Sequence, residues 1–492
     1  MFTSPRRPSA LITAVVTVVL AAALAACGGS TEPDADETGA DSSSSSSAAT
    51  ATATVDPELS RLATEFIDLL VAEDFAAAAA TFDDTMAQAL PAADLATAWQ
   101  QVTGQVGPYK EEIARRQEAT SGYDAVVVTA QFERSPLDIR VVFGADRRIA
   151  GLFFQPATAT GTPTAEAWAP PSYAGEVASR DVTVGDAELP GTLTTPLGAG
   201  PWPAVVLVHG SGPNDRDETI GPNKPFRDLA LGLATRGIAV LAYDKRTLVH
   251  QAEMAAVEDL TVQEEVVDDA VAAVELLRSD RNVADPDRVF VLGHSLGGML
   301  APRIAEASDG VAGLVILAGA ARPLEDLILE QSTYLAGRDG TITAEEEAAL
   351  ANLATQVAAI RDPALDPATP ADRLLGVPAS YWLDLRGYDP PAVAAGLDLP
   401  MLVLQGERDY QVTMTDFALW SEALAGREDV TLRSFPGLNH LMMTGTGDGA
   451  GAADAGAADD AGGLSGPEES DVTGHVAPEV IDAIAGFVLG AG

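Results

Sequence analysis

The spacing of hydrophobic residues divides most of this chain into two folded regions. From Pro57 to Ala157, apolar residues first recur at helical intervals and then form strand-like runs. This order predicts a small α+β domain of two or three helices followed by three antiparallel strands. We expect helices near 59–70, 75–82 and 92–102, strands at 125–132, 137–143 and 149–154, and a hairpin turn at 144–146.

From Tyr173 to the end, apolar strands alternate with amphipathic helices, which predicts an α/β fold with a mostly parallel sheet covered on both faces. After an opening hairpin at 182–195, we expect strands at 204–208, 238–242, 288–292, 311–318, 401–404 and 430–435, and helices at 224–236, 262–277 and 478–489.

An insertion from Arg322 to Leu397 interrupts this alternation and predicts a helical cap over residues 322–397. Thr343-Ala344-Glu345-Glu346 has the pattern of a capping box, which should begin a helix that runs to Arg361. Tyr381, Trp382 and Tyr388 form an aromatic patch further on. These three side chains either line a substrate pocket or hold the cap against the core, and the pattern allows both.

The N-terminal segment before Cys27 has the features of a signal peptide. Arg6 and Arg7 precede an apolar run that is short for a membrane-spanning helix and ends in Leu24-Ala25-Ala26-Cys27. This ending resembles the lipobox of bacterial lipoproteins. The resemblance implies cleavage of residues 1–26, lipidation of Cys27 and anchoring on the outer face of the cytoplasmic membrane; the alternative is a plain secreted protein.

Three other segments lack any hydrophobic pattern that could build a core. Residues 27–56 are rich in Ser, Ala, Thr and acids and predict a disordered tether. Residues 158–172 predict a linker, and 445–470, mostly Gly, Ala and Asp, predict a disordered loop. Cys27 is the only cysteine, so the chain can form no internal disulfide.

Charge and composition restrict the partners. The hydrophobic content of 47% allows a sizeable core, whereas the net charge of −43 argues strongly against nucleic-acid binding, which needs clustered Lys and Arg. No His-Glu-x-x-His, phosphate-loop or dinucleotide motif occurs, so no metal or organic cofactor is expected. A small molecule remains as the expected partner, and the oligomeric state is left open.

The strongest chemical signal is Gly293-His294-Ser295-Leu296-Gly297, directly after a buried strand and directly before a helix. In a G-x-S-x-G elbow, the serine takes a tight strand-to-helix turn and the flanking glycines let other backbone pass close by. An ordinary glycine-rich turn is the alternative for the bare motif. The position of the motif between a strand and a helix favours the interpretation of Ser295 as a nucleophile.

A serine nucleophile needs an oxyanion hole, a base and an acid. The loop His209-Gly210-Ser211-Gly212 follows the first apolar strand, so the backbone amides of Ser211 and Leu296 are the candidate oxyanion donors. Asp409 follows the strand 401–404, with Glu407 as the second choice, and His440 follows the strand 430–435. We expect His209 to be structural and His294 to point away from the nucleophile. Arg216, Asp217 and Lys245 either line the pocket entrance or form ion pairs between loops.

Together these motifs carry a family resemblance. The runs 209–217, 243–246 and 293–298 resemble the α/β-hydrolase superfamily, in particular a bacterial esterase branch related to dienelactone hydrolases and prolyl-oligopeptidase-like enzymes. The resemblance implies Ser295 as nucleophile, His440 as base, Asp409 as its orienting acid, and Ser211 and Leu296 as the oxyanion hole. The chain departs from dienelactone hydrolases in having Ser rather than Cys at the elbow, and from the oligopeptidases in lacking propeller-like repeats. The smaller region resembles the cone-shaped nuclear-transport-factor-two-like superfamily.

We therefore expect a membrane-tethered, extracytoplasmic serine hydrolase that cleaves carboxylic esters. A peptidase or thioesterase could use the same three residues. A non-catalytic envelope lipoprotein that binds a ligand is a further alternative, although the presence of a complete Ser-His-Asp set argues against it.

Overall fold

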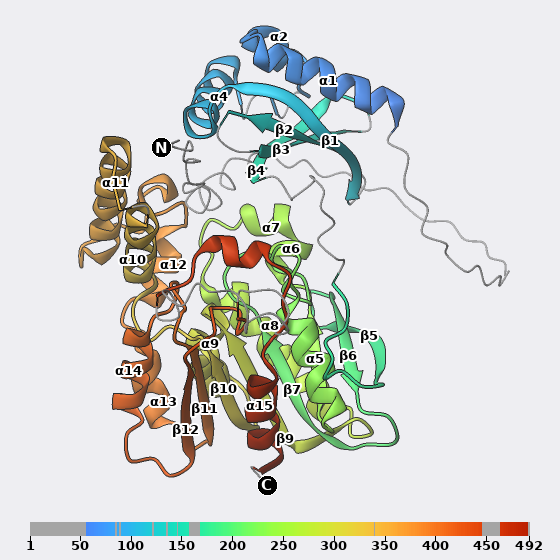
Figure 1. The fold of residues 1–492 in the computed structure, drawn as a ribbon, viewed down its shortest axis with the longest axis vertical. Helices are drawn as coiled ribbons and strands as arrows, with labels where there is room; N and C mark the ends of the chain where they lie inside the picture. The colour runs from blue at the N-terminus through green and yellow to red at the C-terminus, as the bar shows by residue number, and fades with distance from the viewer. Residues whose placement is uncertain are drawn as a thin grey trace, which may run out of the picture. The chain divides into compact units, whose positions relative to one another are not determined.

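The computed structural model describes residues 56–490, apart from 84–85, 88–89, 121–122, 134–135, 145, 157–167, 339 and 445–462. The chain forms two compact units that meet in sequence between Gly161 and Thr162 (Figure 1). The expected signal peptide, Cys27 and nearly all of the tether lie outside the described residues. Among the helices that the structure describes, none is long and apolar enough to cross a bilayer.

The smaller unit packs helices on one face of a four-stranded antiparallel sheet whose strands follow chain order. Its elements are α1 (Pro57–Val71), α2 (Phe75–Ala79), α4 (Ala92–Val106), β1 (Tyr109–Thr120), β2 (Tyr123–Phe132), β3 (Pro136–Phe143) and β4 (Ile149–Pro156). Phe66, Leu95 and Val128 belong to its fully buried core. Asp56, expected in the tether, instead caps α1 by accepting a hydrogen bond from the Glu58 amide at 2.8 Å.

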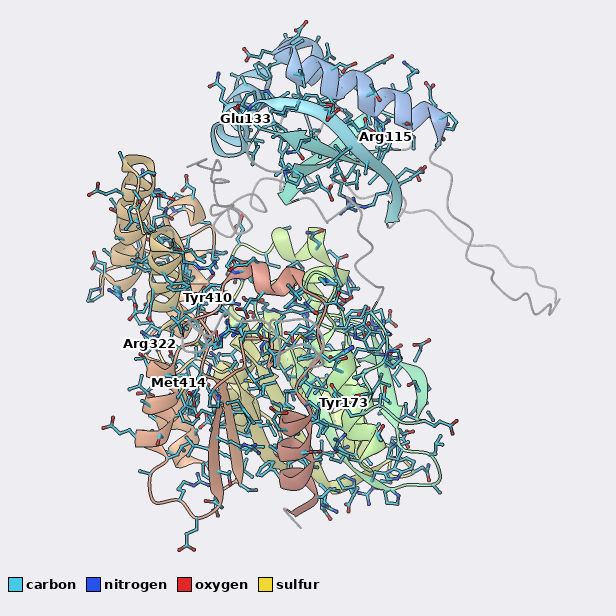
Figure 2. All side chains as sticks on the ribbon, in the orientation of Figure 1. Arg115, Glu133, Tyr173, Arg322, Tyr410 and Met414 are labelled. Carbon is cyan, nitrogen blue, oxygen red and sulfur yellow. The ribbon has the colours of Figure 1, made fainter. Side chains whose placement is uncertain are left out.

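The first strand of this unit, β1, is missing from the expected strands. Its sequence includes Lys110, Glu111, Glu112, Arg115 (labelled in Figure 2) and Arg116, and it has no hydrophobic alternation. The strand lies at the sheet edge and pairs only with β2. Charged side chains are common on edge strands because they discourage pairing with other chains, so periodicity alone could not reveal it.

The larger unit contains an eight-stranded sheet in the order β12-β11-β10-β9-β7-β8-β6-β5. Pairing is parallel from β8 through β7 to β12 and antiparallel among β5, β6 and β8, so the expected mostly parallel sheet is confirmed. The strands are β5 (Ala178–Val184), β6 (Leu189–Thr195), β7 (Trp202–Val208), β8 (Ala239–Tyr243), β9 (Ala284–His294), β10 (Val311–Leu317), β11 (Met401–Gly406) and β12 (Val430–Phe435).

Helices cover both faces of this sheet because successive strand residues point to opposite sides. Val205 and Leu207 pack in one core with α5 and α15, and Val206 and Val208 in another with α8 and α9. The helices outside the insertion are α5 (Pro225–Thr235), α6 (Arg246–Val249), α7 (Gln251–Ala255), the π-helical turn η1 (Gln263–Val267), α8 (Asp268–Ser279), α9 (Leu296–Ala307), α14 (Met414–Ala423), the 3-10 turn η3 (Pro467–Asp471) and α15 (Pro478–Gly490).

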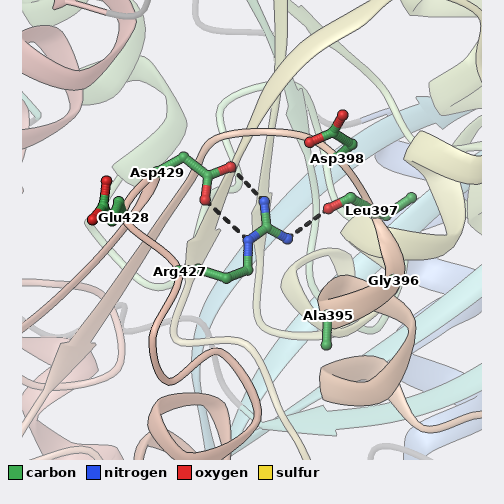
Figure 3. A pocket seen from close by; sticks show the side chains of 7 residues that line it. All are labelled: Ala395, Gly396, Leu397, Asp398, Arg427, Glu428 and Asp429. Atoms are coloured by element: carbon green, nitrogen blue, oxygen red, sulfur yellow. Dashed lines mark hydrogen bonds and ion pairs between the residues drawn. The ribbon is translucent and has the colours of Figure 1, made fainter.

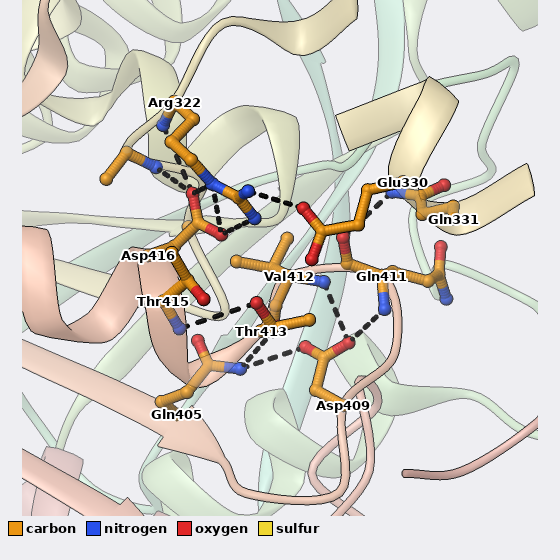
Figure 4. Close-up of polar contacts among 12 residues, drawn as sticks. Arg322, Glu330, Gln331, Gln405, Asp409, Gln411, Val412, Thr413, Thr415 and Asp416 are labelled. Atoms are coloured by element: carbon orange, nitrogen blue, oxygen red, sulfur yellow. Dashed lines mark hydrogen bonds and ion pairs between the residues drawn. The ribbon is translucent and has the colours of Figure 1, made fainter. Parts of the chain in front are cut away.

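The insertion between β10 and β11 is helical, as expected, and is fastened at its first residue. The buried carboxylate of Asp416 accepts hydrogen bonds from the Ala321 and Arg322 amides at 3.0 and 3.1 Å and pairs with the Arg322 guanidinium at 2.7 Å (Figure 4). Arg322 also pairs with Glu330 of the first inserted helix. Thr343 and Glu346 form the predicted capping box. The inserted helices are α10 (Leu324–Gly337), α11 (Ala344–Arg361), the 3-10 turn η2 (Ala371–Arg373), α12 (Ala379–Leu385) and α13 (Pro390–Gly396).

The prediction of a disordered loop over 445–470 is wrong for its last part. Ser465 is buried, and residues 467–471 form η3, whose Glu468 and Glu469 pair with Arg338, directly after α10, and with Arg408. These specific ion pairs offset the low hydrophobicity on which the prediction depended. The remainder, 445–462, lies outside the described residues. Trp168, expected in the linker, belongs to the larger unit, where its indole donates to Asp228 at 3.1 Å.

Candidate active site

Ser295 sits at a strained strand-to-helix turn between β9 and α9. Its backbone has φ 54° and ψ −114°, a region that non-glycine residues rarely occupy. The turn is enforced by close packing, because a β-carbon at position 293 would lie 2.0 Å from the Gly297 carbonyl oxygen. A β-carbon at position 297 would lie 2.3 Å from the Val208 carbonyl oxygen. Both glycines of the motif are therefore required by backbone contacts.

These contacts predict that Gly297→Ala destabilises the elbow. The added methyl group meets backbone of β7, which cannot move aside without shifting the sheet, so we expect a loss of about 3 kcal/mol in the free energy of unfolding. Denaturant titration measures this loss. The matched control is Gly486→Ala in α15, where an added β-carbon meets no atom within 4 Å. Equal stability of the two variants would contradict the prediction.

The loop after β7 places Gly210 directly beside Ser295. A β-carbon built at Gly210 would lie 3.2 Å from Ser295 Cβ and 3.7 Å from Ser295 Oγ. Within the described part of the chain, the Ser211 amide donates to no protein acceptor. Leu296 is the first residue of α9, where an amide has no partner in a preceding helical turn. The two expected oxyanion donors thus belong to loops that flank the same serine.

Asp409 and His440 are in direct contact. The structure places His440 Nδ1 2.7 Å from Asp409 Oδ2, and Asp409 is completely buried. The other oxygen, Asp409 Oδ1, accepts hydrogen bonds from the Gln411 and Val412 amides at 2.7 and 3.0 Å (Figure 4). Since an ionised carboxylate only accepts, His440 Nδ1 is the donor in this contact. No hydrogen bond joins Ser295 Oγ to His440 among the described residues.

Two neighbouring side chains refine this picture. Gln405, which the sequence reasoning overlooked, donates to Asp409 Oδ2 at 3.0 Å and so fixes the carboxylate further. Glu407, the second choice for the acid, accepts instead from Ser434 Oγ on β12 at 2.7 Å. The contact with His440 therefore favours Asp409 as the acid.

His294, within the elbow, points away from Ser295 and holds a buried ion pair beneath it. Its Nδ1 lies 3.0 Å from Glu218 Oε2 and its Nε2 lies 3.0 Å from the His440 carbonyl oxygen. Both ring nitrogens lie close to oxygen atoms, an arrangement that favours the doubly protonated ring. Burial alone would lower the pKa of His294, but the Glu218 carboxylate outweighs it and raises that pKa. Burial likewise opposes ionisation of Glu218, and the charge of His294 overcomes it, so the pKa of Glu218 is lowered.

His209 is a neutral structural residue in this site. Its ring packs 4.8 Å from that of Phe226, and its Nε2 lies 3.0 Å from the Asp215 carbonyl oxygen, so Nε2 must carry the proton. Complete burial lowers the pKa of His209 to about 4. The side chain therefore helps to shape the Gly210 loop without contributing charge.

The low pKa of His209 predicts acid sensitivity. The contribution of neutral His209 is complete above the unfolded pKa of about 6.5 and is lost as the pH falls toward 4, because only the unfolded chain then takes up the proton. His209→Gln, whose amide can still donate to Asp215, removes this titration. Between pH 7 and 4.5, we expect the free energy of unfolding of the wild type to fall by about 2 to 3 kcal/mol more than that of the variant. Denaturant titration at both pH values measures this difference. Parallel pH profiles would contradict this.

The three aromatic residues expected at the substrate pocket occupy structural positions, with Tyr381 and Trp382 buried and Tyr388 partly buried. Trp382 lies in the core of the insertion and donates its indole N–H to the Leu374 carbonyl at 2.9 Å. Tyr388 donates to the Met299 carbonyl of α9 at 2.8 Å. Tyr381 is buried, and burial together with the neighbouring Glu265 carboxylate raises the pKa of its hydroxyl. The Trp382 contact lies within the insertion, and the Tyr388 contact holds the insertion to α9.

Arg216, Asp217 and Lys245 all form ion pairs between loops. Arg216 pairs with Asp244 at 2.7 Å, and Asp217 with Lys224 at 2.8 Å. Lys245 is buried and pairs with Glu265 at 2.5 Å. Of the two roles that the sequence allowed, the structure favours the ion pairs.

A surface hollow of about 600 Å³ lies away from the candidate site (Figure 3). The residues that line this hollow come just before β11 and β12 in the chain, whereas Asp409 and His440 come after these strands. Because the two strands are parallel, the hollow and the candidate site lie at opposite ends of the strands. Arg427 in this hollow already donates to Asp429 and to the carbonyl oxygens of Ala394, Leu397 and Leu399. Its guanidinium has no donor left for a ligand.

Comparison with known protein families identifies the class of protein to which this chain belongs. The model of the alpha/beta hydrolase family matches residues 205–451, and the chain belongs to this family. The chain is a hydrolase. Residues 63–152 match a second family, described as a protein of unknown function (DUF3887).

The relatives include an enzyme of similar length. The chain is 38% identical over 424 residues to Esterase EstD of Thermotoga maritima, covering 86% of this chain and 94% of the esterase. Among solved structures, a Mycobacterium tuberculosis puromycin-hydrolyzing peptidase matches with 17% identity and a TM-score of 0.38, covering 78% of this chain and 48% of that one. Est1E from Butyrivibrio proteoclasticus matches with 16% identity and a TM-score of 0.37, covering 53% and 90%.

Proposed function

We propose that this protein is a serine carboxylesterase that acts through Ser295, His440 and Asp409. The observation that carries the proposal is the strained Ser295 turn beside Gly210, together with the 2.7 Å contact between buried Asp409 and His440. The identity of 38% with Esterase EstD supports ester hydrolysis in particular. An alcohol and a carboxylic acid would be the products.

The proposed reaction has two halves. Ser295 Oγ attacks the ester carbonyl carbon while His440 Nε2 accepts its proton, and the Ser211 and Leu296 amides stabilise the oxyanion. His440 then gives this proton to the departing alkoxide, which is released as the alcohol. The acyl group remains bound to Ser295 as an acyl-enzyme. Water attacks this intermediate with the same base and releases the acid. Asp409 holds His440 in the required tautomer throughout.

A fluorophosphonate probe and a panel of p-nitrophenyl esters test the proposal directly. We expect covalent labelling at Ser295 and saturable ester turnover, both absent in Ser295→Ala. Folded wild-type protein that neither reacts with the probe nor turns over any ester would refute it. Faster turnover of aminoacyl amides or thioesters than of esters would reassign the substrate class without changing the nucleophile.

We also propose that the enzyme works outside the cytoplasm, attached to the membrane by lipid on Cys27. The support is the sequence Leu24-Ala25-Ala26-Cys27 after a short apolar run with two preceding arginines. Expression in a bacterial host with labelled fatty acid should give a lipid-labelled, membrane-bound product. Cys27→Ser should remove the label and release the protein, and a Cys27→Ser product that is still labelled would refute the anchor.

We propose that the smaller unit has the nuclear-transport-factor-two-like fold and that its interior is a packed core rather than a ligand cavity. Helices followed by one antiparallel sheet support the fold, and complete burial of Phe66, Phe82 and Phe132 supports the packed core. Deletion of residues 58–157 should then leave ester kinetics unchanged. A large change in KM would instead assign this unit a part in substrate binding.

A further inference from the structure

Two buried ion pairs hold the backbone of Gly210 from opposite sides. Its N–H donates to Glu218 Oε1 at 2.8 Å, and Glu218 pairs with His294. Its carbonyl oxygen accepts a hydrogen bond from Lys245 Nζ at 3.0 Å, and Lys245 pairs with Glu265. The Lys245 side chain is only 3% exposed. Burying a lysine is costly, so this ammonium group needs both of its acceptors.

The Lys245 contact determines where the next amide points. In a trans peptide the carbonyl oxygen and the following N–H point in opposite directions. Lys245 and the Asn214 side chain, at 3.0 and 3.2 Å, hold the Gly210 oxygen on one side of the peptide. The Ser211 N–H must therefore project to the other side. Because Gly210 borders Ser295, a small rotation of this peptide would carry the N–H away from a developing oxyanion.

The positive charge has a second effect on the same peptide. An ammonium group bound to the Gly210 oxygen draws electron density from the amide and makes the Ser211 N–H a stronger donor. This polarisation matters most when a negative charge forms on the substrate oxygen, as in the transition state. Lys245 would then act on the rate of reaction more than on substrate binding.

We propose that Lys245 is a positioning residue that orients and polarises the Gly210–Ser211 peptide for oxyanion stabilisation. The proposal rests on the proposed serine hydrolase function. Glu265 keeps Lys245 in place and lies near Tyr381 of α12. The helical insertion is thereby connected through Tyr381, Glu265 and Lys245 to the oxyanion loop.

The test compares Lys245→Met with Arg246→Met. The control arginine is the next residue in the chain and pairs with Asp269 of α8 at 2.5 Å; among the described residues it forms no hydrogen bond with Gly210. We expect Lys245→Met to lower kcat about 10²-fold with KM changed less than about threefold. Its affinity for a trifluoromethyl ketone, which forms a tetrahedral adduct with an oxyanion, should fall by a similar factor. Arg246→Met should keep wild-type kcat and ketone affinity.

Several outcomes would overturn the inference. One is a folded Lys245→Met enzyme with wild-type kcat and ketone affinity, and another is an equal loss in both variants. If Lys245→Met does not fold, Asn214→Ala decides, because it removes the weaker bond to the same carbonyl oxygen from a partly exposed side chain. It should lower kcat and ketone affinity together by about threefold to tenfold, and no change would overturn the proposal. Wild type that hydrolyses no ester would refute the proposed function itself, a result distinct from all of these.

Discussion

Ser295→Ala should lower kcat for a p-nitrophenyl ester by about 10⁴-fold to 10⁶-fold. Alanine has no oxygen to form the acyl-enzyme, so only oxyanion stabilisation and binding remain. The fold should be retained, since the Ser295 amide, which donates to the Leu317 carbonyl at 3.0 Å, is unchanged. Purified variant and wild type should therefore show the same melting temperature, with the difference confined to turnover and probe labelling.

Ser211→Ala is the matched control for this prediction. The proposed role of Ser211 uses only its backbone N–H, and its side chain is exposed. Removing the hydroxyl should leave kcat within about threefold of wild type. A drop comparable to that of Ser295→Ala would indicate that the Ser211 hydroxyl takes part in the chemistry. Residual turnover by Ser295→Ala near the wild-type rate would remove Ser295 from the mechanism.

Asp409→Asn should lower kcat by about 10³-fold to 10⁴-fold. The side-chain oxygen of the introduced asparagine must face the Gln411 and Val412 amides, which donate to Asp409 Oδ1 in the wild type. Its NH₂ group then faces His440 Nδ1. Two donors cannot pair, so His440 would accept at Nδ1 and carry its proton on Nε2. That tautomer cannot take a proton from Ser295.

The control for Asp409→Asn is Glu407→Gln, which changes the alternative carboxylate on the same turn. The introduced glutamine can still bond to Ser434, the partner of Glu407 in the wild type, so activity should stay close to wild type. Steady-state kinetics with a single ester compare the two variants. A larger loss in Glu407→Gln than in Asp409→Asn would transfer the role of the acid to Glu407.

Much of the larger unit could be predicted because its signals are local. The strands β7, β9, β10 and β11 each contain a continuous apolar run, and parallel strands end at a common edge. Ser295 follows β9, Asp409 follows β11 and His440 follows the neighbouring strand β12, so these residues can be placed near one another from chain order alone.

The supporting contacts could not be predicted in this way. Glu218 and Lys245 meet Gly210 from different loops, and neither has a neighbouring motif that marks it as buried. Burial of a charged residue depends on its partner, which sequence spacing does not reveal. The charged edge strand β1 was missed for a related reason, since its pairing with β2 depends on backbone hydrogen bonds and not on a hydrophobic face.

The His294–Glu218 pair has a consequence for engineering this enzyme. Position 294 is one of the two variable positions of the elbow motif. It would be a natural choice in a mutant library designed to change the range of substrates. Here its ring holds Glu218, and through it the Gly210 amide, while its other nitrogen bonds the His440 backbone. Most replacements would leave a buried carboxylate unpaired and disturb three loops together. Libraries for altered selectivity should therefore leave position 294 unchanged and vary side chains that face the substrate.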